Sequence, residues 1–273
     1  MDLSIVIVNY KSKKKLETCL DSIFKAGIKD LSFEIILVEN NSAEDLSDLV
    51  KLNSNVKLIV SEKNLGMGGG NNLGIKTAQG EYILVLNPDT VIKDEAINVL
   101  LSYLKNNPGV GLVGPKLLNT DNSLQYSCSR FPKFYMPILR RTFLGKYFEV
   151  DRDNFQMREF DHNSIKTVDW MLGSALMFKK ELTLVNGKIW EPRFDERYFM
   201  YFEDTDLNRN FWSHGFKVVY NPRAVLIHDH ARQSAKYPWY TAVFLDPLAR
   251  HHIASWIKYF LKWGFGIPKN NQN

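Results

Sequence analysis

Short apolar runs alternate with amphipathic stretches along the first half of the chain. The largely β-branched run Leu3–Val8 is typical of a strand buried on both faces. After it, apolar residues recur at i, i+3, i+4, i+7 and i+8 from Leu16 to Phe24, which predicts an amphipathic helix. We expect Ser12 to cap the start of this helix and Gly27 to end it.

The same alternation continues to about residue 113. Further strands are predicted at 33–38, 56–60, 81–86 and 110–113, and further helices at 43–52, up to about 78, and at 94–105. Repeated strand–helix units favour an α/β fold with a doubly wound, mostly parallel sheet. In such sheets, ligands bind beyond the carboxyl ends of the strands.

The second half of the chain is less regular. Residues 115–168 predict loops with short helices or an extra strand. The segment Val168–Lys179 predicts a buried strand or strand pair, interrupted at Gly173 by a close approach of the backbone. A helix is expected to start near Glu203, followed by short strands at 218–220 and 224–227. We expect one domain with a variable second half.

Near the carboxyl end, apolar residues from Ile253 to Leu261 follow helical spacing, with Lys258 and Lys262 on other faces and Arg250 just before them. Two interpretations stay open for this basic, tryptophan-containing helix. It can be a surface helix packed on the domain, or an interfacial helix that binds an anionic membrane leaflet.

Composition narrows the class of protein. The 273 residues are 45% hydrophobic, which excludes a disordered or collagen-like chain. A net charge of +5 is too small, and the charged residues are too dispersed, to indicate a nucleic-acid-binding protein. It does suit binding to an anionic substrate or to an anionic membrane surface. Cys19 and Cys128 show no pairing or zinc spacing, so a reducing compartment is expected. Neither a signal peptide nor an eighteen-residue apolar span is recognised, which predicts a cytoplasmic protein.

Polar clusters follow three of the predicted strands, at Asn9–Tyr10, Glu39–Asn41 and Asn87–Asp89. Turn chemistry explains each cluster taken alone. Because all three fall on one edge of one sheet, we expect a ligand site there. Asp89, on a turn shaped by Pro88, suits a Mg²⁺ or Mn²⁺ ion shared with phosphate, although a plain turn or helix-cap aspartate is the alternative.

The glycine-rich segment Asn64–Asn72 does not match GxGxxG, and no Lys-Ser/Thr pair follows it as in a P-loop. We expect a flexible loop that leads into a short helix, whose N-terminus suits a diphosphate or a base edge. A plain glycine turn is the alternative interpretation.

A second acidic cluster comprises Glu203, Asp204 and Asp206. Crowded carboxylates raise the pKa of at least one member, which can tune a general base, and acids are also favoured at a helix start. His228 and His230 alternate after a predicted strand and are candidates for binding a metal or phosphate.

Seven motifs then follow in a familiar order: IVIVNYK, LVENNS, NLGMGGGNNLGI, LVLNPDT, DWMLGSALMFKK, FDERYFMYFEDTDLNRNF and IHDHARQS. Together they resemble the inverting family 2 glycosyltransferases with the GT-A fold, and most of all a bacterial branch that includes rhamnosyltransferases. The resemblance covers about residues 3–234. The tail HHIASWIKYFLKWGF is similar to the C-terminal helix of that branch.

This resemblance implies roles for individual residues. The nucleotide-sugar site would comprise Val8, Asn9, Tyr10, Glu39, Asn41, Asn64, Gly66, Asn71, Asn87 and Asp89. Asp89 and His228 would bind a Mg²⁺ or Mn²⁺ ion, with Asn87 in place of the first acid of the more common Asp-x-Asp. The acceptor would lie near Trp170, Gly173 and Ser174. Asp204 would be the catalytic base, with Glu203 helping to position it or the acceptor. The charge of the leaving diphosphate, taken by itself, suggests Arg232 as a second cation there.

The resemblance also implies an activity and an organisation. The enzyme would move a sugar, best matched by L-rhamnose from dTDP-rhamnose, to a hydroxyl of a cell-surface glycan or a polyprenyl-linked acceptor. A UDP- or GDP-sugar donor, a non-catalytic scaffold and a nicotinamide oxidoreductase are alternatives. Residues 1–234 would form the GT-A domain, with a nucleotide-binding half to about 115 and an acceptor-binding half from about 116. Residues 235–273 would be a helical extension that can dock the enzyme on the inner face of the membrane.

Overall fold

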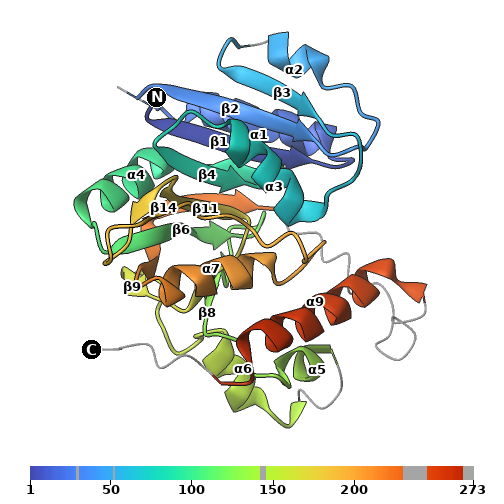
Figure 1. The fold of residues 1–273 in the computed structure, drawn as a ribbon, viewed down its shortest axis with the longest axis vertical. Helices are drawn as coiled ribbons and strands as arrows, with labels where there is room; N and C mark the ends of the chain where they lie inside the picture. Colours follow the sequence, from blue (N-terminus) through green and yellow to red (C-terminus); the bar gives the residue numbers. More distant parts are fainter. Residues whose placement is uncertain (29–30, 52, 142–145, 230–244, 267–273) are drawn as a thin grey trace.

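The computed structural model describes residues 1–28, 31–51, 53–141, 146–229 and 245–266 (Figure 1). The strands along the main sheet are β1 (Leu3–Asn9), β2 (Phe33–Glu39), β3 (Val56–Val60), β4 (Tyr82–Leu86), β5 (Thr90–Ile92), β6 (Val110–Leu118), β11 (Ala175–Lys179) and β14 (Lys217–His228). Their spatial order is β3-β2-β1-β4-β11-β6-β14-β5. The pairs β3/β2, β2/β1, β1/β4 and β6/β14 are parallel. The predicted mixed α/β fold with a mostly parallel sheet is therefore confirmed.

Smaller strands extend this frame. β7 (Leu124–Gln125) pairs with β6, and β9 (Lys166–Thr167) pairs with β14. Two short pairs lie outside the main sheet: β8 (Cys128–Ser129) with β10 (Trp170–Met171), and β12 (Leu182–Thr183) with β13 (Ile189–Trp190). The segment Val168–Lys179, predicted as a buried strand or strand pair, forms two strands that do not pair with each other, because β10 pairs with β8 and β11 pairs with β4 and β6. The sequence pattern did not predict β5, β12 or β13.

Helices cover both faces of the sheet. They are α1 (Lys13–Lys25), α2 (Ser47–Lys51), α3 (Gly66–Thr77), α4 (Ala96–Asn106), α5 (Met136–Arg141), α6 (Glu149–Phe155), α7 (Glu203–Ser213) and α9 (Pro247–Trp263). Alternate residues of β1 enter two cores: Leu3, Ile5 and Ile7 pack with α1 and α4, whereas Val6 and Val8 pack on the side of α3 and α7. Both faces of β1 are thus buried, as its uninterrupted apolar pattern predicted.

Strand β11 runs antiparallel to both of its neighbours, β4 and β6. Ala175 pairs with Leu86, the last residue of β4. The beginning of β11 therefore lies at the edge where β4 ends, and Gly173 and Ser174 reach that edge. The carbonyl oxygen of Ser174 accepts a hydrogen bond from the N–H of Asn87 at 2.9 Å.

The glycine-rich segment is not the flexible loop that we expected, because α3 begins at Gly66 and includes all of its glycines. A Cβ atom at Gly74 would lie 2.4 Å from Cγ1 of Val6, and one at Gly70 would lie 2.8 Å from Cγ1 of Val8. The glycines therefore let the helix lie directly on β1. Glycine lowers helix propensity, but packing against the sheet overrides it here.

Three other local predictions were wrong. Ser12 stands at the start of α1, but its hydroxyl donates to the Tyr10 carbonyl, and the Glu44 carboxylate instead accepts from the N–H groups of Ser12 and Lys13. The predicted helix at 43–52 shortens to α2. The two strands predicted at 218–220 and 224–227 are one strand, β14, with an irregular register between Asn221 and Val225.

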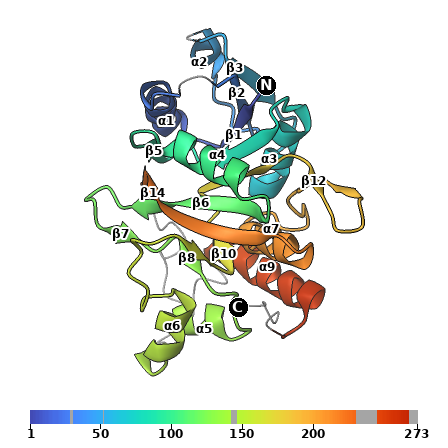
Figure 2. The ribbon, with the colours of Figure 1, turned by 90° about the vertical axis from the view of Figure 1, so that its left-hand side faces the viewer.

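Helix α9 lies beside α5 and near α7, at the end of the molecule remote from β2 and β3 (Figures 1 and 2). Its buried residues Tyr259 and Phe260 form a cluster with Tyr198 and Phe202, just before α7. Of the helices that the structure describes, none combines the length and the apolar character needed to cross a membrane.

Candidate active site

Buried polar atoms without a hydrogen-bond partner gather among the predicted site residues. Within the described ranges nine side-chain atoms are of this kind. Five belong to predicted site residues: Asn9 Oδ1, Asn71 Oδ1, Asp89 Oδ1, Ser174 Oγ and Glu203 Oε2. Leaving a buried polar atom without a partner is costly, so folded proteins keep few of them. Their presence at strand ends and helix starts is typical of a surface that a polar ligand completes.

The ends of β1 and β2 form the first wall of this site. Asn9 is fully buried, and its amide donates to Glu44 Oε2 at 2.8 Å. Glu39 is also buried, and its carboxylate accepts from the N–H groups of Asn41 and Ser42. The oxygens of Glu39 are therefore occupied by its own turn, while Tyr10 remains 43% exposed and available to a ligand.

Asn40, which the sequence analysis did not single out, links β2 to the start of α3. Its amide donates to Asn64 Oδ1 and to the Gly66 carbonyl, and its oxygen accepts from the N–H of Leu65. Asn64 Oδ1 also accepts from the N–H of Gly66. Asn64 and Gly66 thus shape the entry to α3. Farther along the helix, the amide of Asn71 donates to the Met67 carbonyl.

The start of α3 is partly closed to a ligand. Gly66 has a φ of +73°, and a Cβ atom there would lie 2.0 Å from the Phe199 carbonyl oxygen. That oxygen accepts a hydrogen bond from the N–H of Met67 at 3.0 Å. Part of the helix N-terminus that we expected to suit a diphosphate or a base edge is therefore occupied by the chain itself.

Asp89 and His228 meet where β4 and β14 end. His228 Nε2 lies 3.4 Å from Asp89 Oδ1, and His228 is 3% exposed. Lys15 on α1 contributes positive charge, with Nζ 3.9 Å from Asp89 Oδ2 and 2.9 Å from Asp229 Oδ2. His230 and Arg232 lie outside the described residues.

These residues fit a divalent cation that phosphate also holds. Asp89 Oδ1 is buried and faces the imidazole Nε2 of His228 at 3.4 Å, with no other hydrogen-bond partner among the described residues. Carboxylate and imidazole are both ligands for Mn²⁺, and Mg²⁺ commonly takes one or two carboxylates plus substrate phosphates. In the described part of the chain no three His, Cys, Asp or Glu side chains gather as a metal cage. The remaining ligands would have to come from phosphate and water.

Asp204 lies against the segment that precedes β11. Its Oδ2 accepts from the N–H of Gly173 at 2.9 Å, and its Oδ1 accepts from the N–H of Thr205 at 2.6 Å. A Cβ atom at Gly173 would lie 3.0 Å from the Asp204 Cβ, so this contact favours glycine. Asn208 lies one turn along α7. Its side-chain oxygen accepts from the N–H of Met171, and its amide nitrogen donates to the carbonyls of Met171 and Asp204. The base candidate is therefore fixed to the predicted acceptor segment.

Burial raises the pKa of Glu203, and the adjacent Asp204 carboxylate raises it further. Burial also raises the pKa of Asp204, while the N–H groups of Gly173 and Thr205 oppose that rise. An aspartate with a raised pKa that stays hydrogen-bonded in its ionised form suits proton abstraction.

The turn before α7 is strained. Tyr201 and Phe202 both have positive φ, 68° and 66°, which is uncommon for residues other than glycine. Their rings pack near His252 of α9, at centroid distances of 5.0 and 5.5 Å. Because α9 holds this turn, it helps to aim Glu203 and Asp204.

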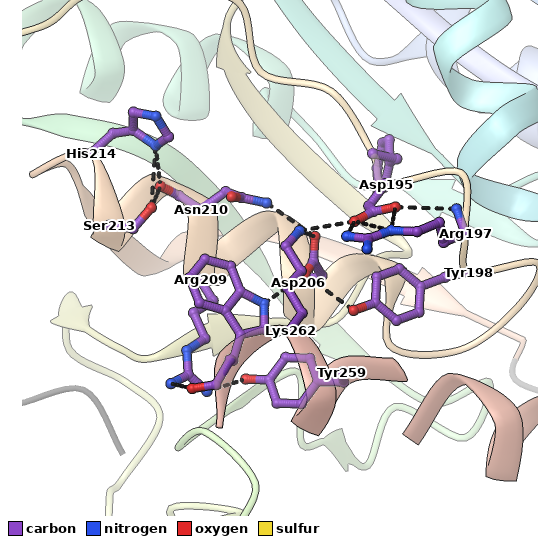
Figure 3. Close-up of polar contacts among 12 residues, drawn as sticks. Asp195, Arg197, Tyr198, Asp206, Arg209, Asn210, Ser213, His214, Tyr259 and Lys262 are labelled. Carbon is purple, nitrogen blue, oxygen red and sulfur yellow. Dashed lines mark hydrogen bonds and ion pairs between the residues drawn. The ribbon is translucent and has the colours of Figure 1, made fainter. Parts of the chain in front are cut away.

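Asp206 does not join the other two carboxylates. It is fully buried and points to α9, where Lys262 Nζ lies 2.8 Å away (Figure 3). Trp263 Nε1 lies 2.6 Å from its carboxylate. Burial raises its pKa, although Lys262 and Trp263 favour the ionised form. The structure therefore splits the predicted acidic cluster into a pair that faces the site and one carboxylate that holds two helices together.

The remaining predicted residues have mainly local contacts. Trp170 Nε1 donates to the Arg130 carbonyl at 2.8 Å, which fixes the ring beside the acceptor segment. Val8 is buried beneath Gly70 and supports α3 at the site. Asn87 caps its own turn, since its carbonyl accepts from the Thr90 hydroxyl at 2.7 Å.

Comparison with known proteins finds a matching family and related sequences. Residues 4–165 match the family model described as glycosyl transferase family 2. The chain is 28% identical over 269 residues to the N-acetylglucosaminyl-diphospho-decaprenol L-rhamnosyltransferase of Mycobacterium tuberculosis, covering 93% of this chain and 83% of that one. It is 23% identical over 265 residues to rhamnosyltransferase WbbL of Escherichia coli, covering 92% and 94%.

Two solved structures share the fold. S. aureus TarS superposes with a TM-score of 0.57 at 15% identity over 84% of this chain and 60% of the other. GalNAc-T7 with UDP, GalNAc and Mn²⁺ superposes with a TM-score of 0.62 at 15% identity, covering 85% and 44%.

The contact between Asp206 and Lys262 gives a first prediction. In Lys262→Met, the buried carboxylate loses its cation, so the free energy of unfolding should fall, toward the lower end of roughly 3–5 kcal/mol because Lys262 is partly exposed. The Asp206 pKa would rise further above its unfolded value, and the stability of such a group is present at low pH and lost as pH increases. Urea unfolding should therefore show a larger deficit at pH 8 than at pH 5.

Lys258→Met is the matched control, because Lys258 also lies on α9 and its Nζ donates to the backbone carbonyl of Arg197. It should unfold nearly as the parent does. An equal deficit for the two variants, or a Lys262→Met deficit independent of pH, would contradict the assignment.

Proposed function

The chain belongs to glycosyl transferase family 2, and we propose that it transfers L-rhamnose from dTDP-L-rhamnose, with inversion, to a hydroxyl of a lipid-linked or cell-surface glycan. The observation that carries the proposal is the set of unpartnered buried polar atoms at the strand ends, next to a base candidate held against Gly173. The two rhamnosyltransferase relatives span almost the whole chain and support the choice of sugar. A UDP- or GDP-sugar donor is the second candidate, and the UDP in the GalNAc-T7 structure favours testing it.

Asp204 is the proposed base. A sugar hydroxyl is a poor nucleophile at neutral pH, and a carboxylate within hydrogen-bond reach removes its proton as it attacks the anomeric carbon. The N–H of Gly173 orients Asp204 Oδ2, so the proton acceptor is in place before the acceptor sugar arrives. The nucleoside diphosphate leaves from the opposite face, and a single displacement inverts the anomeric centre.

Asp89 and His228 are proposed to bind Mg²⁺ or Mn²⁺ at the donor diphosphate. When bound, such an ion offsets the negative charge that develops on the leaving group. Lys15 adds a cation on the same side. In this proposal, residues up to about 115 chiefly bind the donor, and residues from about 116 to 234 chiefly bind the acceptor and supply His228 to the metal. Helix α9, within the C-terminal extension from 235, contacts α7 through Lys262 and Trp263.

The donor is tested by thermal shift. Ligand binding to the native state stabilises it by RT ln(1 + [L]/Kd), so a matching nucleotide raises the melting temperature. We expect dTDP with Mn²⁺ to give the largest increase in a series with UDP, GDP, CDP and NADH, each with and without the ion. A larger shift with UDP or GDP would replace the donor, and no shift with any nucleotide would reject a competent donor site.

The base is tested with Asp204→Asn. The amide oxygen can still accept from Gly173, but it cannot take a proton, so kcat should fall by about 10²–10⁴-fold while the nucleotide-induced thermal shift remains. Because burial raises the Asp204 pKa, the acid limb of kcat/KM in the parent should lie above the ordinary aspartate range. Turnover of Asp204→Asn near the parental rate would remove the base assignment.

Helix α9 is proposed to dock the enzyme on an anionic membrane. No acidic residue occurs between Pro247 and Trp263, which carry Arg250, Lys258 and Lys262. Its outer face presents Ile257 and Leu261, 47% and 81% exposed. Lys262 binds Asp206 on the inner side of the helix, so the exposed basic residues are Arg250 and Lys258. A helix with exposed apolar and basic residues suits anionic lipid, and a lipid-linked acceptor would lie in the same surface.

The double variant Ile257→Glu, Leu261→Glu should therefore cosediment less with vesicles that contain phosphatidylglycerol. Val185→Glu with Ile189→Glu is the control, because both residues are exposed on the β12–β13 hairpin and bring the same change in charge. Equal vesicle binding by the two double variants would reject the membrane proposal and would leave the catalytic proposal unaffected.

A further inference from the structure

A chain of hydrogen bonds runs from the surface to His228 through the turn between β6 and β7. Asp121 Oδ1 accepts from the Ser123 hydroxyl at 2.6 Å, and Ser123 Oγ accepts from the Asn119 amide at 2.8 Å. Asn119 Oδ1 accepts from Gln125 Nε2 at 2.8 Å, and Gln125 Oε1 lies 2.6 Å from His228 Nδ1.

The direction of this chain is set at its outer end. A carboxylate only accepts hydrogen bonds, so Ser123 must donate to Asp121 and use its oxygen as an acceptor. Because Ser123 Oγ acts as an acceptor, the amide nitrogen of Asn119 points to Ser123 and its amide oxygen points to Gln125. The Gln125 nitrogen therefore faces Asn119, and it also donates to the His228 carbonyl at 3.3 Å. Two acceptors thus fix the Gln125 amide with its oxygen toward the imidazole.

An amide oxygen cannot donate, so Nδ1 of His228 must carry the hydrogen. A neutral imidazole has only one such hydrogen, which leaves the lone pair on Nε2. Nε2 is the nitrogen that lies 3.4 Å from the buried Asp89 Oδ1. The lone pair of His228 Nε2 and the oxygen Asp89 Oδ1 are both acceptors, and they face each other. A cation bound between them would stabilise this arrangement.

We propose that the Asp121–Ser123–Asn119–Gln125 chain, here called the relay, holds the hydrogen of His228 on Nδ1, so that Nε2 and Asp89 Oδ1 together bind a divalent cation. Gln125 is then a positioning residue for the metal, a role that rests on the proposed function. Partners of this kind orient the imidazole and strengthen its binding to metal. The relay is formed by a hairpin turn, apart from the motifs that resemble the family.

The tautomer is measured without a metal or a substrate. Histidine ¹⁵N–¹H correlation spectra of the full chain at pH 8 distinguish a hydrogen on Nδ1 from one on Nε2, and His228→Gln identifies the signal. We expect the Nδ1–H form in the parent, a shift toward the Nε2–H form in Gln125→Leu, and return of the Nδ1–H form in Gln125→Glu, whose carboxylate also accepts. An Nε2–H parent, or a spectrum unchanged in Gln125→Leu, would overturn the relay.

Metal binding is measured separately, by electron paramagnetic resonance of free Mn²⁺ in the presence of dTDP. Gln125→Leu should weaken Mn²⁺ binding by about 10- to 100-fold, and Gln125→Glu should bind nearly as the parent does. Gln156→Leu, the same change at a half-buried glutamine after α6, serves as the control. An Nδ1–H parent that binds no Mn²⁺ would reject Nε2 as a metal ligand and the proposed metal, while the tautomer result would stand. Equal Mn²⁺ affinity in the parent and Gln125→Leu would reject the positioning role alone.

Discussion

The antiparallel pairing of β11 with β4 is the constraint on which the site depends. If β11 followed the direction of its neighbours, its first residues would lie at the opposite edge, away from Asp89. Because it is reversed, the N–H of Asn87 binds the Ser174 carbonyl, and Gly173 links that edge of the sheet to Asp204. One reversed strand thus brings together a donor-side carboxylate and a base candidate that are more than a hundred residues apart in sequence.

A second constraint is the way α9 holds α7. Lys262 and Trp263 neutralise and bind the buried Asp206, while Arg209 Nη1 reaches Tyr259 Oη at 3.1 Å (Figure 3). Asp206 lies two residues beyond Asp204, and the strained turn before α7 packs against α9. The C-terminal helix therefore combines an inner face that contacts α7, which carries the proposed base, with an outer face that we propose binds lipid. Docking on a membrane and alignment of the base would share one element.

Prediction from the sequence succeeded where each residue faces a uniform environment. The runs that became β1, β2 and β4 are buried on both sides, so their apolar patterns translate directly into strands. Prediction failed where a contact with a part of the chain distant in sequence decides the local structure. The glycines from Gly66 to Gly74 disfavour a helix locally, but α3 forms because their missing side chains let it approach Val6 and Val8. Likewise, the N–H groups at the start of α1 are capped by the carboxylate of Glu44, from the loop after β2, and not by the Ser12 hydroxyl.

By itself, the sequence determined the strand–helix order, the polar strand ends and the ordered motifs that indicated a family 2 glycosyltransferase. These features are local, or they are repeated in order along the chain. Tertiary structure alone decided which polar groups meet. It separated Asp206 from Glu203 and Asp204, set Asn40 between β2 and α3, and brought Gln125 to His228. Such contacts depend on strand direction and register, and a sequence pattern does not specify which side chains a fold will place a few ångströms apart.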